Sequence, residues 1–507
     1  MGSLVVYGSS DQAGSRDRSV DRDLNDRLAK VLRANSFTGR MQSQLEDRLG
    51  REIDLALAEL GRNLWYDKVH SLHQDNTCAG CHSPSNGFGD TQSIAIGVDS
   101  NNKVGPGRKG PRNQRRSPLV INTAFYPKLM WNGRFSAIPA PGQLLGNPFS
   151  NKYGFEFPLP EGTTMFPPND RIALHLLHAQ AHIPPTETVE VAGFTGTCPG
   201  GVASVGIFQT QCQFDNDKGV SVPEPDASGF RNQPIRDKAV ALLNDVPKYR
   251  KLFGKVFPKV AHGDAIDFRM AARAIAEFEF TLTFADAPLD QFGRGERGAM
   301  TAAEKRGALV FFGVGQCVQC HAVKGPSNEM FSDFQNHVAG IVQIAPQITP
   351  GGKSNMVYDG PGGDEDFGLQ QITGLDSDRY KFRTAPLRNI GLAPAFFHNG
   401  AVVDLEKAIR YHINPEVEGP AYNPARAGIA RDLALAPRGP LQPVLDRLDP
   451  LLRGGIDLTN DEIKDVTQFI KTGLLDERAK KDNLCALVPK TLPSGLRPLE
   501  FEACGKH

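Results

Sequence analysis

The sequence has no long apolar run, no net charge, and little cysteine outside two short motifs. No stretch reaches the roughly 18 consecutive apolar residues of a membrane-spanning helix, so we expect no transmembrane segment. Lys plus Arg and Asp plus Glu each number 57, so no net field favours nucleic acid or an anionic membrane surface. The 507 residues are 40% hydrophobic and 22% charged, which is typical of a globular protein with two or three domains.

Cysteine is concentrated in two Cys-x-x-Cys-His motifs, CAGCH and CVQCH. Each motif brings two thiols and an imidazole together within about one turn of chain. Two thiols can form thioether bonds to the vinyl groups of a haem while the imidazole binds the iron. The motifs therefore predict two covalently bound c-type haems, attached through Cys78, Cys81 and His82 in the first motif and through Cys317, Cys320 and His321 in the second.

Two other functions of such motifs find less support. A structural zinc site needs two further Cys or His ligands at short spacing, and neither motif has such a pair nearby. A thioredoxin-like dithiol is expected within a βαβ unit, and the surrounding sequence does not have that pattern.

The start of the chain, MGSLVVYGSSDQAGS, lacks a basic segment followed by an apolar one, so no signal peptide is visible. Haem of the c type is attached outside the bacterial cytoplasm. We therefore expect a periplasmic protein from which the export signal has been removed.

Four cysteines lie outside the motifs. Pairing of near neighbours would join Cys198 to Cys212 and Cys485 to Cys504, which is plausible in an oxidising compartment. Four free thiols are the alternative, because spacing does not establish connectivity.

The apolar pattern predicts a mainly α protein with two cytochrome-c-like haem domains, long loops and a small irregular or β insertion. Apolar residues recur every three or four positions in 17–66, 236–283 and 301–313, whereas Gly and Pro dominate the segments after each motif. The expected units are a helical extension (1–50), a first domain with an insertion (51–240), a second domain (241–475) and a tail (476–507).

Several segments resemble the bacterial di-haem cytochrome c peroxidase and MauG superfamily in their order along the chain. They include ELGRNLWYDKVHSLHQDNTCAGCH, VINTAFYPKLMWNGRF, LTFADAPLDQF, TAAEKRGALVFFGVGQCVQCH and YKFRTAPLRNIGLAPAFFHNGAVVDLEKAIRYH. The resemblance covers roughly residues 50–475. It implies an enzyme whose first haem reacts with peroxide and whose second haem receives electrons.

In this superfamily a Gln, a Pro four residues later and a Glu ten residues after the Gln lie beside the first haem. Here Gln180, Pro184 and Glu190 have that spacing, so Glu190 is the expected acid and base catalyst. Glu156 is the alternative carboxylate. The other early Gln, Gln143, has no Glu ten residues later.

Two further features follow from the resemblance. Trp131, in WNGR, corresponds to a Trp between the haems, although Asn132 replaces the usual Asp; a purely structural Trp is the alternative. A calcium ion between the haems is also implied. Its ligands would be the Asn113 side chain and the carbonyl groups of Thr384 and Pro386.

Two positions depart from the superfamily pattern. Where many of these peroxidases have a His on the distal side of the first haem, this chain has Ile96 in SIAIG, which predicts an open first haem. The sixth ligand of the second haem, a Met in the peroxidases and a Tyr in MauG, falls on His412; Tyr411 would take the role after a shift of one residue. His398, in FFHNG, is where the superfamily also has a His and is expected to hydrogen-bond near the second haem; Met330 and Met356, in long loops, are weaker candidate ligands than His412.

The resemblance implies a peroxidase that converts hydrogen peroxide to water. Its electrons would come from a small donor protein, a cytochrome c or a cupredoxin. Alternatives are a MauG-like enzyme that oxidises residues of a partner protein, a non-catalytic electron-transfer cytochrome, and a haem oxygenase of hydrocarbon polymers. Members of the superfamily are often dimers, so a homodimer is an expectation by analogy.

Overall fold

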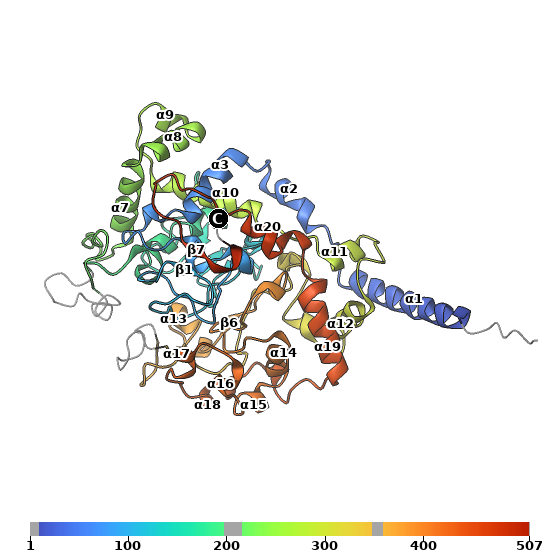
Figure 1. The fold of residues 1–507 in the computed structure, drawn as a ribbon. Helices are drawn as coiled ribbons and strands as arrows, with labels where there is room; N and C mark the ends of the chain where they lie inside the picture. The colour runs from blue at the N-terminus through green and yellow to red at the C-terminus, as the bar shows by residue number, and fades with distance from the viewer. Residues whose placement is uncertain (1–9, 197–214, 347–357, 506–507) are drawn as a thin grey trace, which may run out of the picture.

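The computed structural model describes residues 10–196, 215–346 and 358–505. Helices connected by long loops dominate this part of the chain (Figure 1), which confirms the predicted mainly α class. Through residue 281 the helices are α1 (Ser10–Ala34), α2 (Leu45–Leu49), α3 (Leu55–Tyr66), α4 (Cys78–Cys81), α5 (Leu176–Gln180), α7 (Asn232–Asn244), α8 (Pro247–Val256), α9 (Pro258–Ala261) and α10 (Phe268–Thr281). They are followed by α11 (Pro288–Gly293), α12 (Ala302–Phe312), α13 (Gln370–Thr373), α14 (Leu405–Ile413), α15 (Pro415–Glu418), α16 (Pro424–Ala427), α17 (Arg431–Ala434), α18 (Gln442–Leu445), α19 (Asn460–Gln468) and α20 (Lys481–Cys485).

The helices that precede and support the motifs begin at strong capping residues. Asp54 accepts hydrogen bonds from the first N–H groups of α3, which leads toward the first motif. Thr301 and Glu304 form a capping box at the start of α12, which leads into the second motif. Thr459 and Glu462 do the same for α19, which packs against α12.

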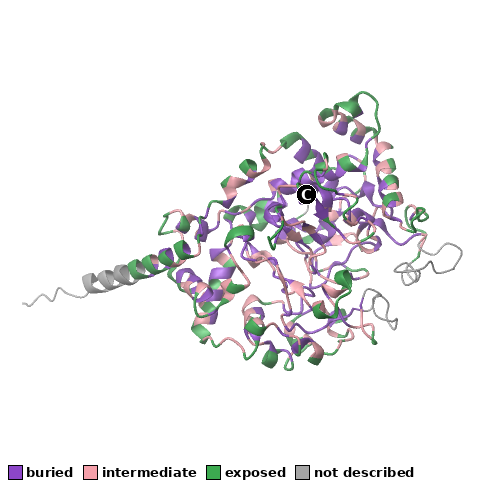
Figure 2. Cartoon of the chain, turned by 180° about the vertical axis from the view of Figure 1, so that it is seen from behind, coloured by how far each residue is buried: buried purple, intermediate pink, exposed green. Residues whose placement is uncertain are grey.

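The first unit is built around α3 and α10, which pack together over much of their length. Its core includes apolar residues of α3, α7, α8 and α10 and of the C-terminal tail. Buried chain, purple in Figure 2, is concentrated in the interior of the molecule. Because α10 belongs to this core and ends at Thr281, we propose that the boundary between the units follows α10 instead of lying at residue 240. The tail beyond 476 also lies beside the first unit, where α20 is seen near α3 and α10 in Figure 1.

Three small sheets hold loops in place. Strand β1 (Lys103–Val104) pairs in parallel with β7 (Glu500–Phe501). Strands β2 (Lys128–Leu129), β3 (Phe135–Ala137) and β4 (Phe155–Glu156) form an antiparallel sheet, and β5 (Asn336–His337) pairs with β6 (Phe382–Arg383). The tight turn between β2 and β3 contains Trp131, whose carbonyl accepts a hydrogen bond from the N–H of Arg383 at 2.7 Å. The β2–β3 turn is thereby joined to β6.

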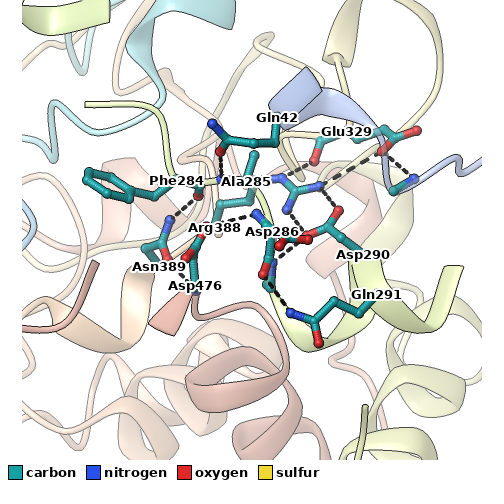
Figure 3. Close-up of polar contacts among 12 residues, drawn as sticks. Gln42, Phe284, Ala285, Asp286, Asp290, Gln291, Glu329, Arg388, Asn389 and Asp476 are labelled. Carbon is teal, nitrogen blue, oxygen red and sulfur yellow. Dashed lines mark hydrogen bonds and ion pairs between the residues drawn. The ribbon is translucent and has the colours of Figure 1, made fainter. Parts of the chain in front are cut away.

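A buried polar network joins distant segments (Figure 3). The guanidinium of Arg388 forms two hydrogen bonds, of 2.6 and 2.8 Å, with the carboxylate of Asp290 in α11. The side chain of Asn389 donates to the carbonyl of Phe284 at 2.8 Å and accepts from the N–H of Asp476 at 2.8 Å. These bonds tie the segment after β6 to α11 and to the start of the tail.

The described chain contains the predicted disulfide between Cys485 and Cys504, while the four motif cysteines are free thiols. The predicted pairing of Cys198 with Cys212 lies outside the described residues. Within the described ranges, no helix combines the length and apolar character that crossing a membrane requires.

Candidate functional site

The first motif forms α4, a single helical turn that ends at His82. The Nδ1 of His82 lies 3.1 Å from the carbonyl oxygens of both Phe88 and Pro118. Because carbonyl oxygens only accept, Nδ1 carries the proton and Nε2 keeps its lone pair. Burial lowers the pKa of His82 to about 4, so the imidazole is neutral. A neutral ring held by a backbone carbonyl is the usual form of a metal-binding histidine.

The second motif repeats this arrangement. The Nδ1 of His321 lies 3.0 Å from the carbonyl oxygen of Phe331. Burial lowers the pKa of His321 and raises the pKa of Cys317 to about 12, so both groups are uncharged. Each motif therefore offers two free thiols and one neutral imidazole, which is the donor set of a covalently attached haem.

Each motif opens into a cavity lined mainly by apolar side chains. The cavity of the first motif has a volume of about 530 Å³ and that of the second about 240 Å³. The larger first cavity is also more polar. Both donor sets fit the haem that the motifs predict, and the first cavity has more room for a small reactant.

The second cavity has an imidazole on each side. The rings of His321 and His412 have their centroids 6.2 Å apart. Two imidazoles that bind one metal through bonds of about 2 Å place their centroids about 6 Å apart, which matches this separation. Burial lowers the pKa of His412 to about 4, although its Nδ1 has no hydrogen-bond partner. Tyr411, the alternative ligand, instead donates its hydroxyl hydrogen to the carbonyl of Gly340 at 2.9 Å. Its hydroxyl is therefore already engaged in a hydrogen bond.

The other candidates around the second haem are less well placed. Met330 is fully buried in an apolar cluster and does not line the cavity. Met356 lies outside the described residues. His398 lines the cavity and stacks on Phe382, with ring centroids 3.7 Å apart.

The structure brings the predicted Gln, Pro and Glu of the first site together. Gln180, Pro184 and Glu190 all line the first cavity, as do the first-motif residues. Glu190 lies in a wide helical turn, Thr188–Ala192. Burial, with a smaller contribution from the charge of Glu187, raises the pKa of Glu190 to about 7, and Arg134 opposes this shift. A carboxyl group that titrates near neutrality can both accept and return a proton.

The alternatives for this role lie elsewhere. Glu156 and Gln143 are exposed and do not line the first cavity, so the choice of Glu156 as the alternative carboxylate was wrong. Ile96 is buried and also does not line it. Among the described residues that line the first cavity, His82 is the sole histidine.

Trp131 lies between the two sites and lines both cavities. Its Nε1 donates to the carbonyl oxygen of Arg116 at 2.8 Å. Arg116 and Arg383 also line both cavities and are buried. Pro118, Leu119 and Tyr126 line both cavities as well, so the wall between them combines apolar groups with one indole and two guanidinium groups.

The predicted calcium ligands do not form a site that fits the ion. The side-chain oxygen of Asn113 is buried without a partner, but Asn113 lines only the first cavity. Thr384 and Pro386 line only the second. The carbonyl of Thr384 already accepts hydrogen bonds from the hydroxyl of Ser332 at 2.7 Å and from the guanidinium of Arg383 at 3.2 Å. A calcium ion therefore has no part in the reaction proposed below.

A carboxyl group in the first cavity was not anticipated from the sequence. Glu279 lies on the buried face of α10 and lines the cavity, and one of its oxygens has no partner. Burial raises its pKa to about 8. The sequence feature that could have revealed Glu279 is its position among the apolar residues of an amphipathic helix, where an uncompensated charge costs free energy. Glu190 is thus not the only titratable carboxyl group in the cavity.

Buried hydrogen bonds fasten the segment that carries Glu190 to the chain before the first motif. The Nε2 of His73 accepts from the N–H groups of Phe194 and Thr195 at 2.9 and 3.0 Å. The side chain of Asn76 donates to the carbonyl of Glu190 at 2.6 Å. His73 therefore positions the Glu190 segment without lining the cavity.

His73 also belongs to a group that resembles a metal site. Carboxylate oxygens of Asp75 and Asp99 lie 3.7 and 3.6 Å from its Nδ1. Because Nε2 accepts backbone hydrogen bonds, Nδ1 must carry the proton and has no lone pair for a metal. The ammonium of Lys218, 2.7 Å from Asp99, already supplies a positive charge there.

Replacing His73 by Phe is expected to destabilise the protein and slow its reaction. Phe keeps the ring but removes the acceptor, and each buried N–H left without a partner costs about 1–3 kcal/mol. The midpoint of chemical denaturation and the peroxide-dependent rate measure the two effects. Exposed His262 provides the control, since its replacement by Phe should change neither. An unchanged rate in the His73 variant would contradict a positioning role.

Comparison with known proteins agrees with this geometry. The sequence model of the family described as "Di-haem cytochrome c peroxidase" matches residues 55–298. The chain is 25% identical over 367 residues to "Cytochrome c551 peroxidase" of Pseudomonas aeruginosa, covering 72% of this chain and 74% of that protein. It is 22% identical over 372 residues to "Methylamine utilization protein MauG" of Methylophilus methylotrophus, covering 73% and 76%.

Solved structures share the fold. A MauG-like protein associated with microbial copper homeostasis superposes with a TM-score of 0.51 at 23% identity, covering 84% of this chain and 91% of that one. The diheme peroxidase BthA from Burkholderia thailandensis gives a TM-score of 0.50 at 18% identity, covering 88% and 90%. With two haem-binding motifs at two cavities, the chain is similar to the di-haem cytochrome c peroxidase and MauG family, whose model matches residues 55–298, and this family implies two covalently bound haems.

Proposed function

We propose that this protein is a periplasmic peroxidase that reduces hydrogen peroxide to two molecules of water, using two protons and two electrons. The observation that carries the proposal is the first cavity. Its lining includes the half-buried Glu190 together with Gln180 and, among the described residues, no second histidine that could close the site. An electron-transfer cytochrome has no need of such a cavity or of a carboxyl group within it.

The haem of the first cavity, when bound, supplies the oxygen chemistry. The chain supplies proton transfer and positioning. In its ionised form Glu190 accepts a proton from one oxygen of the peroxide and then donates it to the other oxygen, which leaves as water. Gln180 lines the same cavity, where its amide would hydrogen-bond the peroxide, while Pro184 would restrict the backbone between Gln180 and Glu190.

We propose that His321 and His412 are the two axial ligands of the second site and that Trp131 couples the two sites electronically. The 6.2 Å separation of the two imidazole rings and the position of Trp131 on both cavity walls support these roles. The name of the Pseudomonas aeruginosa relative supports a small cytochrome c as electron donor, with a cupredoxin as the alternative. A homodimer remains a proposal by analogy.

A MauG-like oxidation of a partner protein is the second candidate. It is favoured by the MauG relative and by the two imidazoles at the second site, because a second imidazole stabilises the oxidised haem more than a thioether does. The hydrogen-bonded hydroxyl of Tyr411 speaks against the Tyr ligand expected for MauG itself.

Peroxide consumption by the holoprotein with a reduced small cytochrome c separates the candidates. Rapid consumption, with two donor molecules oxidised per peroxide, supports the peroxidase. Slow consumption accompanied by oxidation of a protein substrate supports the second candidate. Consumption of O₂ that added peroxide does not stimulate would contradict both and indicate an oxygenase.

The resting ferric protein is expected to show one high-spin and one low-spin haem. The first cavity offers His82 as its sole lining histidine in the described chain, whereas the second offers an imidazole on each side. Electron paramagnetic resonance and the visible absorption spectrum measure the two spin states. Two low-spin signals and no high-spin signal would contradict an open first site.

The rate of peroxide reduction is expected to rise with pH through about 7. The pKa of Glu190 is about 7, raised mainly by burial. Below that pH the carboxyl group is protonated and cannot accept the peroxide proton; above it the carboxylate is ready to do so. A profile of kcat/KM against pH measures this, and the inflection should disappear in Glu190→Gln. An inflection that persists in the variant would assign it to another group, such as Glu279.

A further inference from the structure

Arg116 and Arg383 are buried arginines without a carboxylate partner; buried Arg108 also lacks one, but its guanidinium bonds to backbone carbonyls and to Asn76 and lines neither cavity. Arg116 and Arg383 are 3% and 4% exposed and line both cavities. None of the ion pairs within the described ranges includes either residue, whereas equally buried Arg388 forms a two-bond ion pair with Asp290 (Figure 3). Burying an unpaired charge costs free energy. Arg116 and Arg383 would therefore be stabilised by anions that come from outside the chain.

The contacts of Arg116 leave part of its guanidinium free. Its Nη1 donates to the carbonyl of Ala395, while its Nη2 is buried without a hydrogen-bond partner. Burial lowers the pKa of Arg116 to about 10, and the nearby charge of Asp90 opposes this shift only in part. Arg116 therefore remains a cation at neutral pH, with a free donor at the wall between the cavities.

Arg383, which lines the same two cavities, is held by backbone groups. Its Nε donates to the carbonyl of Met130 at 2.9 Å and its Nη1 to the carbonyl of Thr384 at 3.2 Å. The second bond uses one of the oxygens that the family resemblance assigns to calcium. A divalent cation at that oxygen would lie close to a buried guanidinium, and like charges repel strongly in an interior of low dielectric constant.

We propose that Arg116 and Arg383 bind carboxylate groups presented from both cavities and thereby take the place of the calcium ion. A haem carries two propionate carboxylates, so the two haems implied by the family supply anions of the required class. Guanidinium groups suit this role because they stay charged and match the planar carboxylate with paired donors. The inference depends on the presence of the haems and not on the peroxidase reaction.

The first test is the metal content of the wild-type holoprotein. After dialysis against a calcium chelator, we expect less than one-tenth of a calcium ion per chain and unchanged absorption and paramagnetic resonance spectra. One tightly held calcium ion per chain, or spectra that change on chelation and recover on adding calcium, would overturn the proposal. This measurement needs no variant and is independent of turnover.

The second test removes the charge of Arg116. Arg116→Gln should lower the midpoint potentials of both haems, because a nearby cation favours the reduced and less positive state. Arg116→Lys keeps the charge and should restore most of the lost potential. Arg112→Gln is the control, since Arg112 is buried and paired with Asp432 but lines neither cavity. Potentials that stay the same in Arg116→Gln, or fall equally in Arg112→Gln, would contradict the proposal.

Discussion

Glu190→Gln is expected to lower the rate of peroxide reduction by a factor of about 10²–10⁴, the usual contribution of a general acid–base residue. The amide has nearly the shape of the carboxyl group but cannot accept the peroxide proton. The residue lines the first cavity together with Gln180. Steady-state consumption of peroxide with a reduced donor measures the loss. The haem content, measured as the pyridine complex, should not change.

Glu187→Gln is the matched control. Glu187 lines the same cavity, three residues earlier, and its carboxylate lies 3.5 Å from the guanidinium of Arg134. Its replacement removes a negative charge that helps to raise the pKa of Glu190, so the pH profile should shift to lower pH while the maximal rate stays within a factor of a few. Equal losses in both variants would indicate general damage to the cavity wall and not the loss of the catalytic base.

The position of Glu190 at the first cavity could be predicted from the sequence because the family pattern is one of spacing. Gln180, Pro184 and Glu190 keep their separations even though insertions surround them, and the structure places all three on one cavity. The two Cys-x-x-Cys-His motifs are local in the same sense, since a single turn of chain contains the complete donor set. Such local features can be recognised even where the overall sequence identity is low, such as the 25% identity to the Pseudomonas aeruginosa relative.

The sequence did not reveal features that depend on long-range contacts. Arg116 and Arg383 are far apart in the chain and line the same two cavities because the backbone of each is hydrogen-bonded to Trp131. Glu279 belongs to a helix that a boundary at residue 240 would place in the other unit, yet it packs with α3 around the first cavity. The burial that shifts its pKa is a property of the assembled core.

The two sites differ in chemistry although their motifs are alike. In the first, the cavity beyond the motif contains the carboxyl groups of Glu190 and Glu279 and has the larger volume. In the second, an imidazole of α14 faces the motif histidine. Under the proposed function, the chain segments that come after each motif determine which site receives peroxide and which is closed, and the second assignment depends on His412.

His412→Ala is expected to change the second haem from low spin to high spin. The variant removes one of the two imidazoles whose centroids lie 6.2 Å apart and puts no ligand in its place. His412→Met should keep the low-spin state but raise the midpoint potential of this haem, by about tens to hundreds of millivolts, within the roughly 0.8 V over which axial ligands act. Paramagnetic resonance and a spectroelectrochemical titration measure the two changes.

Tyr411→Phe separates ligation from a structural effect on α14. It removes the hydroxyl that contacts the backbone of Gly340 and Val342, so a modest loss of stability is expected, with the low-spin signal intact. Low-spin signals of the second haem that persist in His412→Ala and vanish in Tyr411→Phe would assign the ligand to Tyr411 and favour the MauG-like reaction. Loss of the low-spin signal in His412→Ala, with the signal intact in Tyr411→Phe, would instead assign two imidazoles to the second site, a ligand set suited to an oxidised haem. The cavity around Glu190 would then be the site of peroxide reduction.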